Sequence, residues 1–252
     1  MVPAFDAEAI HQFRVTYKKL RAFLRMISGE HSSGDIKVSK KLNKCYHIAG
    51  SIRDLHLHQQ RLLEATKQDL LKPTSYLDLL QKKIEILKST LSEIFLKKPV
   101  TKSKKKTDAV IPGEFSLSAF NTYIQNKSAV ITTIIIAGNF SDIKIHSVRK
   151  HLKDLSYNRK SFEVDEHDTL QASLWIGKDE KYVTALTDEL GNFQDKCAAI
   201  ALMKPSWLRN LHKLEQEQLE EIKKQWRNEK AAMKKLLVKK LKTDFAGQQD
   251  TN

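Results

Sequence analysis

The chain has 252 residues, of which 44 are Lys or Arg and 30 are Asp or Glu, so its formal net charge is +14. This excess of positive charge points to a polyanionic partner. Hydrophobic residues make up 40% of the chain, which excludes wholesale disorder. Eight Gly and five Pro are few for this length, so sheets built from hairpins are disfavoured and a mostly helical fold is expected.

The sequence shows no feature of secretion or of membrane insertion. Its two cysteines, Cys45 and Cys197, form no Cys-x-x-Cys pair, which is typical of a reduced cytoplasmic setting. The first ten residues lack the basic and apolar regions of a signal peptide. The longest aliphatic-rich run, residues 129–137, is too short to cross a bilayer. We therefore expect a cytoplasmic protein without a membrane partner.

Three helices are predicted in the first part of the chain. Apolar residues at spacings of three and four predict a helix over about residues 6–28 and another over about 36–71. Pro73 ends the second of these, because proline disfavours a continuing helix. A third helix follows, in which Leu77 to Ile94 form one apolar seam. The lysine-rich segment 97–112 is then expected to be an exposed linker.

Four more helices are predicted after the linker. The first covers about residues 115–137, with a buried strand as the alternative because its VITTIII run is β-branched. Asp142 is expected to cap a helix that reaches about residue 162, before an irregular stretch that includes the acidic segment VDEHD at 164–168. The last two helices are expected at about 179–203 and 205–245.

Two short motifs occur twice in the same order. His11-x-x-Arg14-x-x-x-Lys18 returns as His146-x-x-Arg149-x-x-x-Lys153, and Gly50-x-x-Arg53-Asp54 returns as Gly191-x-x-Gln194-Asp195. The apolar residues around the second motif repeat with it: Leu42, Cys45, Ala49 and Ile52 correspond to Val183, Leu186, Leu190 and Phe193. Such ordered self-similarity predicts an internal structural repeat.

The first motif forms a basic ridge on each predicted helix. At 100° per residue, the basic residues of the first helix fall within an arc of about 80° beside the apolar stripe, and those of the second within about 100°. The first ridge contains His11, Arg14, Lys18, Arg21 and Arg25, and the second contains His146, Arg149, Lys150, Lys153, Tyr157 and Lys160. Neither ridge contains an acid, whereas an ordinary solvated helix face mixes both signs.

These motifs resemble the CHAD domain, the conserved-histidine α-helical domain, over roughly residues 5–245. The resemblance implies an all-α fold of two helical bundles about a pseudo-two-fold axis, with a basic cleft between them. Its implied ligand is inorganic polyphosphate, and some members associate with polyphosphate granules. On this basis the single domain, residues 1–252, divides into a first bundle half at 5–96, a linker at 97–112 and a second half at 113–245.

The expected function is non-catalytic binding of polyphosphate by the two ridges, without a cofactor or a metal ion. Arginines would supply forked donors to phosphate oxygens, lysines would add less directional charge, and His11 and His146 would donate more strongly when protonated. The predicted binding residues are His11, Arg14, Lys18, Lys19, Arg21, Arg25, Arg53, His146, Arg149, Lys150, Lys153 and Tyr157. Asp54 and Asp195 are expected to orient neighbouring arginines rather than to touch an anion.

The second copy departs from the family pattern. Asp154 and Ser156 stand where basic residues are usual, and Gln194 replaces the motif arginine. The first half is therefore expected to contribute most of the binding.

Three other kinds of site compete with this interpretation. A metal site lacks tetrahedral Cys/His spacing. An enzyme that acts on phosphate esters or polyphosphate would need a phosphate-binding loop or paired carboxylates, and the sequence shows neither. Nonspecific nucleic-acid binding is the main alternative because it shares the charge argument, although the first ridge has no aromatic side chain for base stacking.

Overall fold

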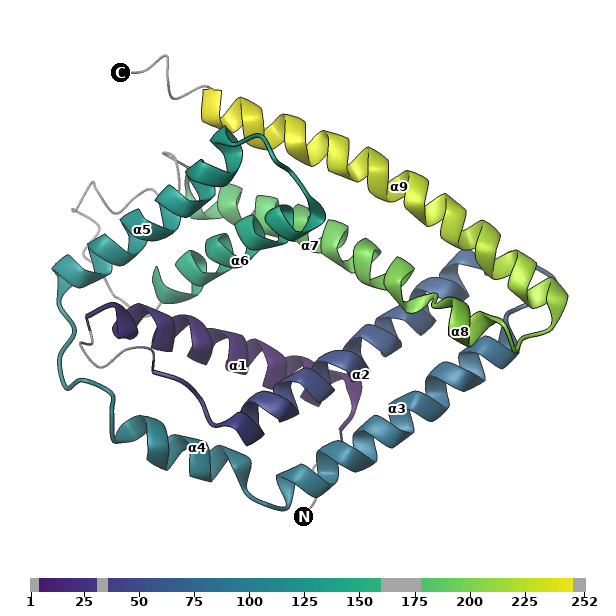
Figure 1. The fold of residues 1–252 in the computed structure, drawn as a ribbon, viewed down its shortest axis with the longest axis horizontal. Helices are drawn as coiled ribbons and strands as arrows, with labels where there is room; N and C mark the ends of the chain where they lie inside the picture. Colours follow the sequence, from purple (N-terminus) through teal and green to yellow (C-terminus); the bar gives the residue numbers. More distant parts are fainter. Residues whose placement is uncertain (1–4, 31–35, 160–177, 247–252) are drawn as a thin grey trace. The chain divides into compact units, whose positions relative to one another are not determined.

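A computed structural model describes residues 5–30, 36–159 and 178–246. Within these residues the chain is all-α, with one short 3-10 helix and no β-strand, which confirms the expected fold class (Figure 1). In chain order the elements are α1 (Ala7–Ile27), η1 (Ser28–Glu30), α2 (Lys40–Ala65), α3 (Thr74–Phe95), α4 (Pro99–Asp108), α5 (Leu117–Ile136), α6 (Asp142–Arg159), α7 (Glu180–Leu202), α8 (Pro205–Leu208) and α9 (Lys213–Ala246).

The β-branched run near residue 131 is helical, so the strand alternative for this segment is wrong. In α5, Ile131, Ile134 and Ile135 are buried at spacings that place them on one face of the helix. The Ser116 hydroxyl accepts a hydrogen bond from the backbone N–H of Ala119 at 3.1 Å and caps the first turn. Burial of the isoleucines on one helix face outweighs the extended preference of the individual residues.

The segment predicted as an exposed linker contains helix α4 over residues 99–108. Pro99, Ser103 and Thr107 recur every four residues and make a small buried face. The backbone N–H of Ser39 donates to the Ser103 hydroxyl at 3.0 Å. Because Ser39 is the N-cap residue of α2, this hydrogen bond connects α4 to the start of α2. Lys98 precedes α4 in the left-handed conformation, with φ of 49°, and turns the chain into the helix.

Two other details at helix ends differ from expectation. The single helix predicted over 205–245 is α8 followed by α9, and the side-chain amide of Gln216 donates to the Leu211 carbonyl at 2.7 Å in the break between them. The Ser141 hydroxyl, rather than Asp142, accepts from the Lys144 N–H at the start of α6. Asp142 instead binds Lys230 and Lys234. The predicted irregular stretch at 164–168 lies outside the described residues.

The chain divides into two compact units that each combine separate parts of the sequence. The first unit contains Met1–Lys18, Lys37–Val110 and Lys196–Glu229, and the second contains Lys19–Ile36, Ile111–Asp195 and Lys230–Asn252. Three of the five boundaries fall inside α1, α7 and α9, so these three helices contribute residues to both units. The division into halves at 5–96 and 113–245 stays a prediction based on the sequence repeat.

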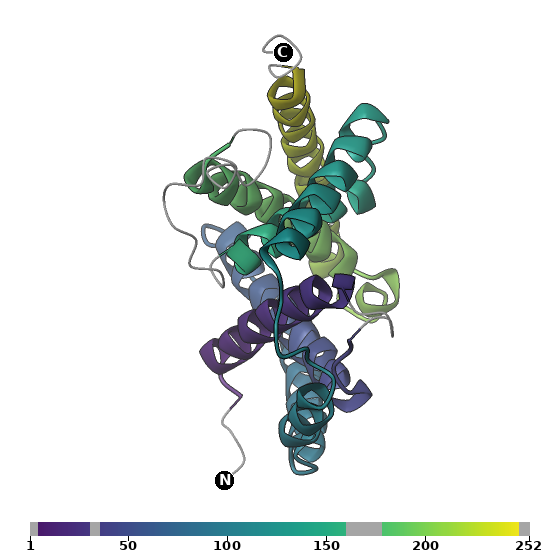
Figure 2. The same cartoon turned by 90° about the vertical axis from the view of Figure 1, so that its left-hand side faces the viewer.

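The core of the first unit forms around α2 and α3, which lie side by side in both views (Figures 1 and 2). Leu42, Cys45, Ala49 and Ile52, predicted to form the apolar face of α2, are all buried. Residues from α9 complete this core. The buried members of the cluster are Ile10, Cys45, Ala49, Ile52, Leu55, Leu62, Tyr76, Leu80, Ile84, Leu91, Ala199, Met203, Leu208, Leu219, Ile222 and Trp226.

In the second unit α5 packs against α6. The apolar residues predicted to support the second basic ridge are buried: Ile145, Val148, Leu152 and Leu155. The predicted counterparts on α7 are buried as well: Val183, Leu186, Leu190 and Phe193. Among the described helices of both units, none combines the length and the apolar character that a membrane span requires.

Candidate functional site

In the first unit, the motif arginine of α1 lies against the motif glycine of α2. Arg14 Nη1 donates to the backbone carbonyl of Tyr46 at 3.2 Å. A Cβ atom at position 50 would overlap Arg14 Nη1, so the guanidinium fits here only because residue 50 is glycine. This contact explains why a helix interior, where glycine is unfavourable, contains Gly50.

Aromatic rings hold the arginine of the first unit in place. The Arg14 guanidinium carbon lies 4.9 Å from the centroid of the Tyr46 ring, within cation–π distance. Tyr46 stacks on Tyr17 with ring centroids 4.3 Å apart and planes inclined by 17°. The Tyr17 hydroxyl donates to the Asn43 side-chain oxygen at 2.8 Å. The sequence interpretation missed Tyr46 because nothing in its spacing separates it from an ordinary helix residue.

The second unit contains the same local contact. Arg149 Nε donates to the backbone carbonyl of Thr187 at 3.3 Å, and Thr187 precedes Gly191 by four residues, as Tyr46 precedes Gly50. A Cβ atom at position 191 would lie 3.2 Å from both Nε and Nη2 of Arg149. The sequence repeat thus has a counterpart in local contacts, with one arginine docked on one glycine in each unit.

The twelve predicted binding residues are divided between the two units. His11, Arg14, Lys18 and Arg53 belong to the first unit, and the other eight belong to the second. Every one of them reaches the surface at least in part, and Lys19, His146 and Lys150 are exposed. Lys160, the last residue of the second ridge, lies outside the described residues. The role of these side chains in binding an anion stays a prediction.

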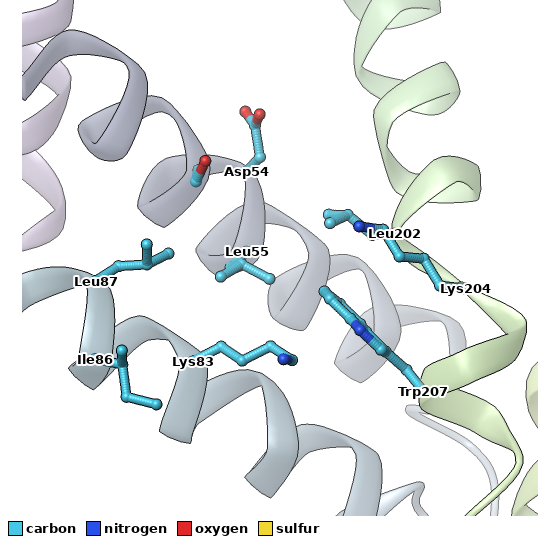
Figure 3. Close-up of a pocket in the computed structure, with 9 residues that line it drawn as sticks. Asp54, Leu55, Lys83, Ile86, Leu87, Leu202, Lys204 and Trp207 are labelled. Carbon is cyan, nitrogen blue, oxygen red and sulfur yellow. The ribbon is translucent and has the colours of Figure 1, made fainter. Parts of the chain in front are cut away.

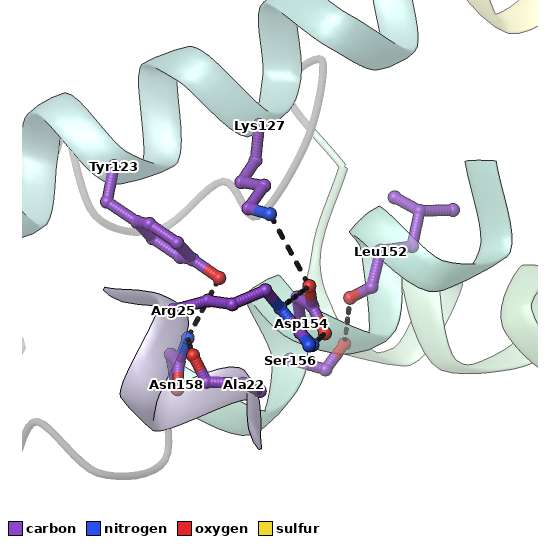
Figure 4. A network of polar contacts seen from close by, with 8 residues as sticks. All are labelled: Ala22, Arg25, Tyr123, Lys127, Leu152, Asp154, Ser156 and Asn158. Atoms are coloured by element: carbon purple, nitrogen blue, oxygen red, sulfur yellow. Dashed lines mark hydrogen bonds and ion pairs between the residues drawn. The ribbon is translucent and has the colours of Figure 1, made fainter. Parts of the chain in front are cut away.

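Arg25, a predicted anion ligand, is held by an acid instead. Arg25 Nε donates to Asp154 Oδ2 at 3.0 Å, and Nη2 donates to Oδ1 at 2.5 Å (Figure 4). Asp154 is buried, and Lys127 of α5 reaches the same carboxylate at 3.4 Å. Burial lowers the pKa of Lys127, and the charge of Asp154 opposes that shift. Asp154 therefore neutralises part of the positive charge that the sequence assigned to the ridges.

Polar contacts continue around this carboxylate. The Asn158 side-chain amide donates to the Ala22 carbonyl and to the Tyr123 hydroxyl, both at 3.0 Å (Figure 4). Burial lowers the pKa of His151 to about 4, and the positive charge of Lys127 adds to that effect. On the same helix, Lys153 forms an ion pair with exposed Asp188 at 3.6 Å. Basic residues of α5 and α6 in the second unit are therefore partly neutralised by neighbouring acids.

A family model for the CHAD domain matches residues 2–204, which include both copies of each motif. The chain belongs to the CHAD domain family. No curated protein and no solved structure gave a significant match. The CHAD match ends before α9, whose residues Leu219, Ile222 and Trp226 nevertheless help to form the core of the first unit.

A hollow of about 390 Å³ in the first unit lies apart from the docked arginine of the CHAD motif (Figure 3). The Trp207 ring forms one wall, and the ammonium groups of Lys83 and Lys204 lie 4.5 and 4.9 Å from its centroid. Asp54 and Leu55 of α2 line another part. Asp54 is the only motif residue that contacts this hollow, and none of the twelve predicted binding residues does. The hollow and the docked Arg14 are therefore separate features of the first unit.

No group of metal-ligating side chains is found in the described part of this CHAD chain. Within residues 5–30, 36–159 and 178–246, no three His, Cys, Asp or Glu side chains are grouped as metal ligands would be. The buried histidine of the first unit, His58, packs its ring edge-on against Tyr76 and Trp226. Burial lowers the pKa of His58 to about 4, as expected for a neutral core residue.

Proposed function

We propose that this protein binds inorganic polyphosphate without transforming it, through basic side chains of α1, α2 and α6. The arginine docked on glycine carries the proposal, because the same contact occurs in both units and fixes a guanidinium at the surface. A guanidinium whose position is fixed loses little side-chain entropy when it binds phosphate. CHAD family membership supports the same ligand class.

The ligand of this proposal is a linear phosphate chain rather than a single phosphate group. Residues 11 to 25 of α1 extend over about 20 Å at the rise of an α-helix. The sequence repeat supports the further expectation that the α1 and α6 ridges are related by a pseudo-two-fold axis and line one basic cleft. Binding would then release counterions, and the affinity would fall steeply with salt.

Contacts of Tyr46 disfavour the nucleic-acid alternative. Binding of single strands without sequence preference normally requires aromatic faces on which bases stack. Tyr46 is the aromatic ring next to Arg14, and its ring already stacks on Tyr17 and contacts the Arg14 guanidinium. A base would have to displace one of these partners, whereas polyphosphate needs no ring.

The test compares two pairs of substitutions that remove the same charge. Arg14→Ala with Arg21→Ala removes two ridge arginines, and Lys235→Ala with Lys239→Ala removes two exposed lysines of α9. Binding of polyphosphate is measured by titration calorimetry at several salt concentrations. We expect the arginine pair to weaken binding roughly tenfold and the lysine pair to change it by less than about twofold. Equal losses of affinity would mean that total positive charge, rather than the ridge arginines, determines polyphosphate binding.

Two further measurements separate this function from its alternatives. A competing single-stranded DNA or RNA should not displace polyphosphate at equal phosphate concentration, and displacement would favour nucleic acid as the ligand. Incubation of polyphosphate with the protein and Mg²⁺ should release no orthophosphate. Release above the level of an Arg14→Ala variant would identify an enzyme.

A further inference from the structure

A second basic surface lies on α2 and α4, away from the repeated motif. It contains three lysines in the first turns of α2 and four in α4, and all seven side chains are exposed. We call it the α2–α4 lysine surface, and its members are Lys40, Lys41, Lys44, Lys102, Lys104, Lys105 and Lys106.

The hydrogen bond between Ser39 and Ser103 brings these lysines together. Ser39 N donates to Ser103 Oγ at 3.0 Å, and both residues belong to the first unit. Lys40 follows Ser39 directly, and Lys102 precedes Ser103 directly. With one 3.8 Å Cα step on each side of this hydrogen bond, the Cα atoms of the two lysines lie within about 15 Å of each other. Flexible lysine side chains on both helices can therefore contact one ligand.

Negative charge is nearly absent from these segments. Residues 36–44 and 97–108 contain one acid, Asp108, which forms an ion pair with Lys104 at 3.2 Å between exposed side chains. None of the ion pairs found among the described residues includes Lys102, Lys105 or Lys106. At 100° per residue these three lysines share an arc of about 100° on α4. Their mutual repulsion opposes the docking of α4, and a bound polyanion would remove that repulsion.

Residue types on this surface indicate which polyanion it fits. The two segments contain no arginine and no aromatic residue. The surface therefore offers neither forked, directional donors nor rings for base stacking. Lysine ammonium groups act as point charges on flexible chains, and they suit a flexible ligand that is charged at every unit and has no bases.

Along the axis of α2 the lysines lie close to the docked arginine, but on another face, because residues two apart on a helix point about 200° apart. Lys44 precedes Tyr46 by two residues, and the Tyr46 carbonyl accepts the hydrogen bond from Arg14. From Lys40 to Tyr46 the helix rises by about 9 Å. A flexible linear chain bound at Arg14 would pass part of the way round α2 to reach these lysines and, through them, those of α4.

We propose that the α2–α4 lysine surface is a second binding segment for the same polyphosphate chain, so that the protein selects long chains over short ones. This inference rests on the proposed function, because the motif site must bind polyphosphate first. Once one part of a chain is bound at Arg14, the rest is present at high effective concentration near α4. A chain too short to reach α4 gains nothing from these lysines.

The experiment uses the full chain and two fractions of polyphosphate, one shorter than α4 and one several times longer. The test variant is Lys102→Gln with Lys105→Gln and Lys106→Gln. The matched control is Lys181→Gln with Lys235→Gln and Lys239→Gln, three exposed lysines of α7 and α9. Affinity is measured against salt concentration, and circular dichroism establishes that each variant keeps its helices.

We expect the test variant to lose roughly tenfold or more in affinity for the long fraction and to reduce the slope of log K against log salt by about 2. Its affinity for the short fraction should stay within about twofold of the unsubstituted protein, and the control should behave likewise with both fractions.

Three results would overturn the inference while polyphosphate binding itself stands. In the first, the test variant and the control lose equal affinity for the long fraction. In the second, the test variant loses equal affinity for both fractions. In the third, it binds single-stranded nucleic acid less tightly but polyphosphate as before, which would assign the surface to nucleic acid. Failure of the proposed function looks different, because the unsubstituted protein would then bind neither fraction.

Discussion

In the first unit Arg14 lies against Gly50 and beside the ring of Tyr46, whereas in the second unit Arg149 lies against Gly191 beside Thr187, which has no ring. In both units the arginine donates to the carbonyl four residues before the glycine, from Nη1 in Arg14 and from Nε in Arg149. Among the described residues, an aromatic ring, that of Tyr46, lies beside the guanidinium of Arg14, and none is found beside that of Arg149. The comparison teaches that glycine provides the space for the arginine, while the neighbouring side chains decide how tightly it is held.

A second difference separates the two helices that carry the arginines. Lys19 is exposed on α1, and the residue at the corresponding position of α6 is Asp154. Asp154 is buried and binds Arg25 and Lys127. At this position of the repeat, α1 thus has a solvent-exposed lysine, whereas α6 has a buried acid that forms ion pairs within the second unit.

The largest expected effect comes from Asp154→Ala. This change leaves Arg25 and Lys127 without the carboxylate between them, and we expect the free energy of unfolding to fall by about 2 to 3 kcal/mol. Urea denaturation measures the loss. Ser156→Ala on the same helix is the control, because its hydroxyl bonds only to the Leu152 carbonyl one turn away (Figure 4). If the two variants lose the same amount, Asp154 is not the structural acid that the comparison requires.

Lowering the pH should reduce the stability of the second unit, because His151 is partly buried there in its neutral form. Its pKa is lowered from 6.5 to about 4 in the folded state, so the unfolded chain takes up a proton first as the pH falls. The contribution of neutral His151 is complete above pH 6.5 and is lost as the pH falls toward about 4. We expect a loss of about 1 to 2 kcal/mol from this ring, allowing for its partial exposure.

His151→Gln should remove that part of the pH dependence, as measured by urea denaturation at several pH values. His58 of the first unit titrates in the same range and supplies the matched variant, His58→Gln. An unchanged profile in the His151 variant would contradict the expected burial of this ring.

Two glycine substitutions should give smaller effects that differ between the units. Alanine itself favours a helix by about 1 kcal/mol over glycine. At position 50 the new methyl group displaces the Arg14 guanidinium and breaks its hydrogen bond to Tyr46, so we expect no gain in stability and a severalfold weaker binding of polyphosphate.

At position 191 the contact of 3.2 Å requires only a small movement of Arg149. Gly191→Ala should therefore keep its affinity and gain up to about 1 kcal/mol in stability. Thermal unfolding and titration calorimetry measure both variants. Equal effects at the two positions would show that the two arginines are held equally tightly.

Helices with strong apolar spacing could be predicted from the sequence. Ile145, Val148 and Leu152 recur at helical spacing, and burial of one face is what makes α6 a helix in the folded chain. Helix α4 could not be found in this way. Its buried face consists of Pro99, Ser103 and Thr107, which carry no apolar signal among the lysines.

The site was predictable in part. Two motifs and their order pointed to Arg14 and Arg149, and a glycine in the interior of each partner helix was a signal of close approach that the interpretation did not use. The pairing of Arg25 with Asp154 and Lys127 had no local signal. These residues come from three helices far apart in the sequence, and only the fold brings them together.

The division of α9 between the two units has a consequence for synthesis on the ribosome. Leu219, Ile222 and Trp226 complete the core that Ile10 and α2 begin, and the Glu215 side chain accepts a hydrogen bond from the Tyr76 backbone. The core of the first unit therefore cannot be completed until more than two hundred residues have been translated. Until then α2 and α3 expose apolar surface, which is the condition in which nascent chains aggregate or recruit chaperones.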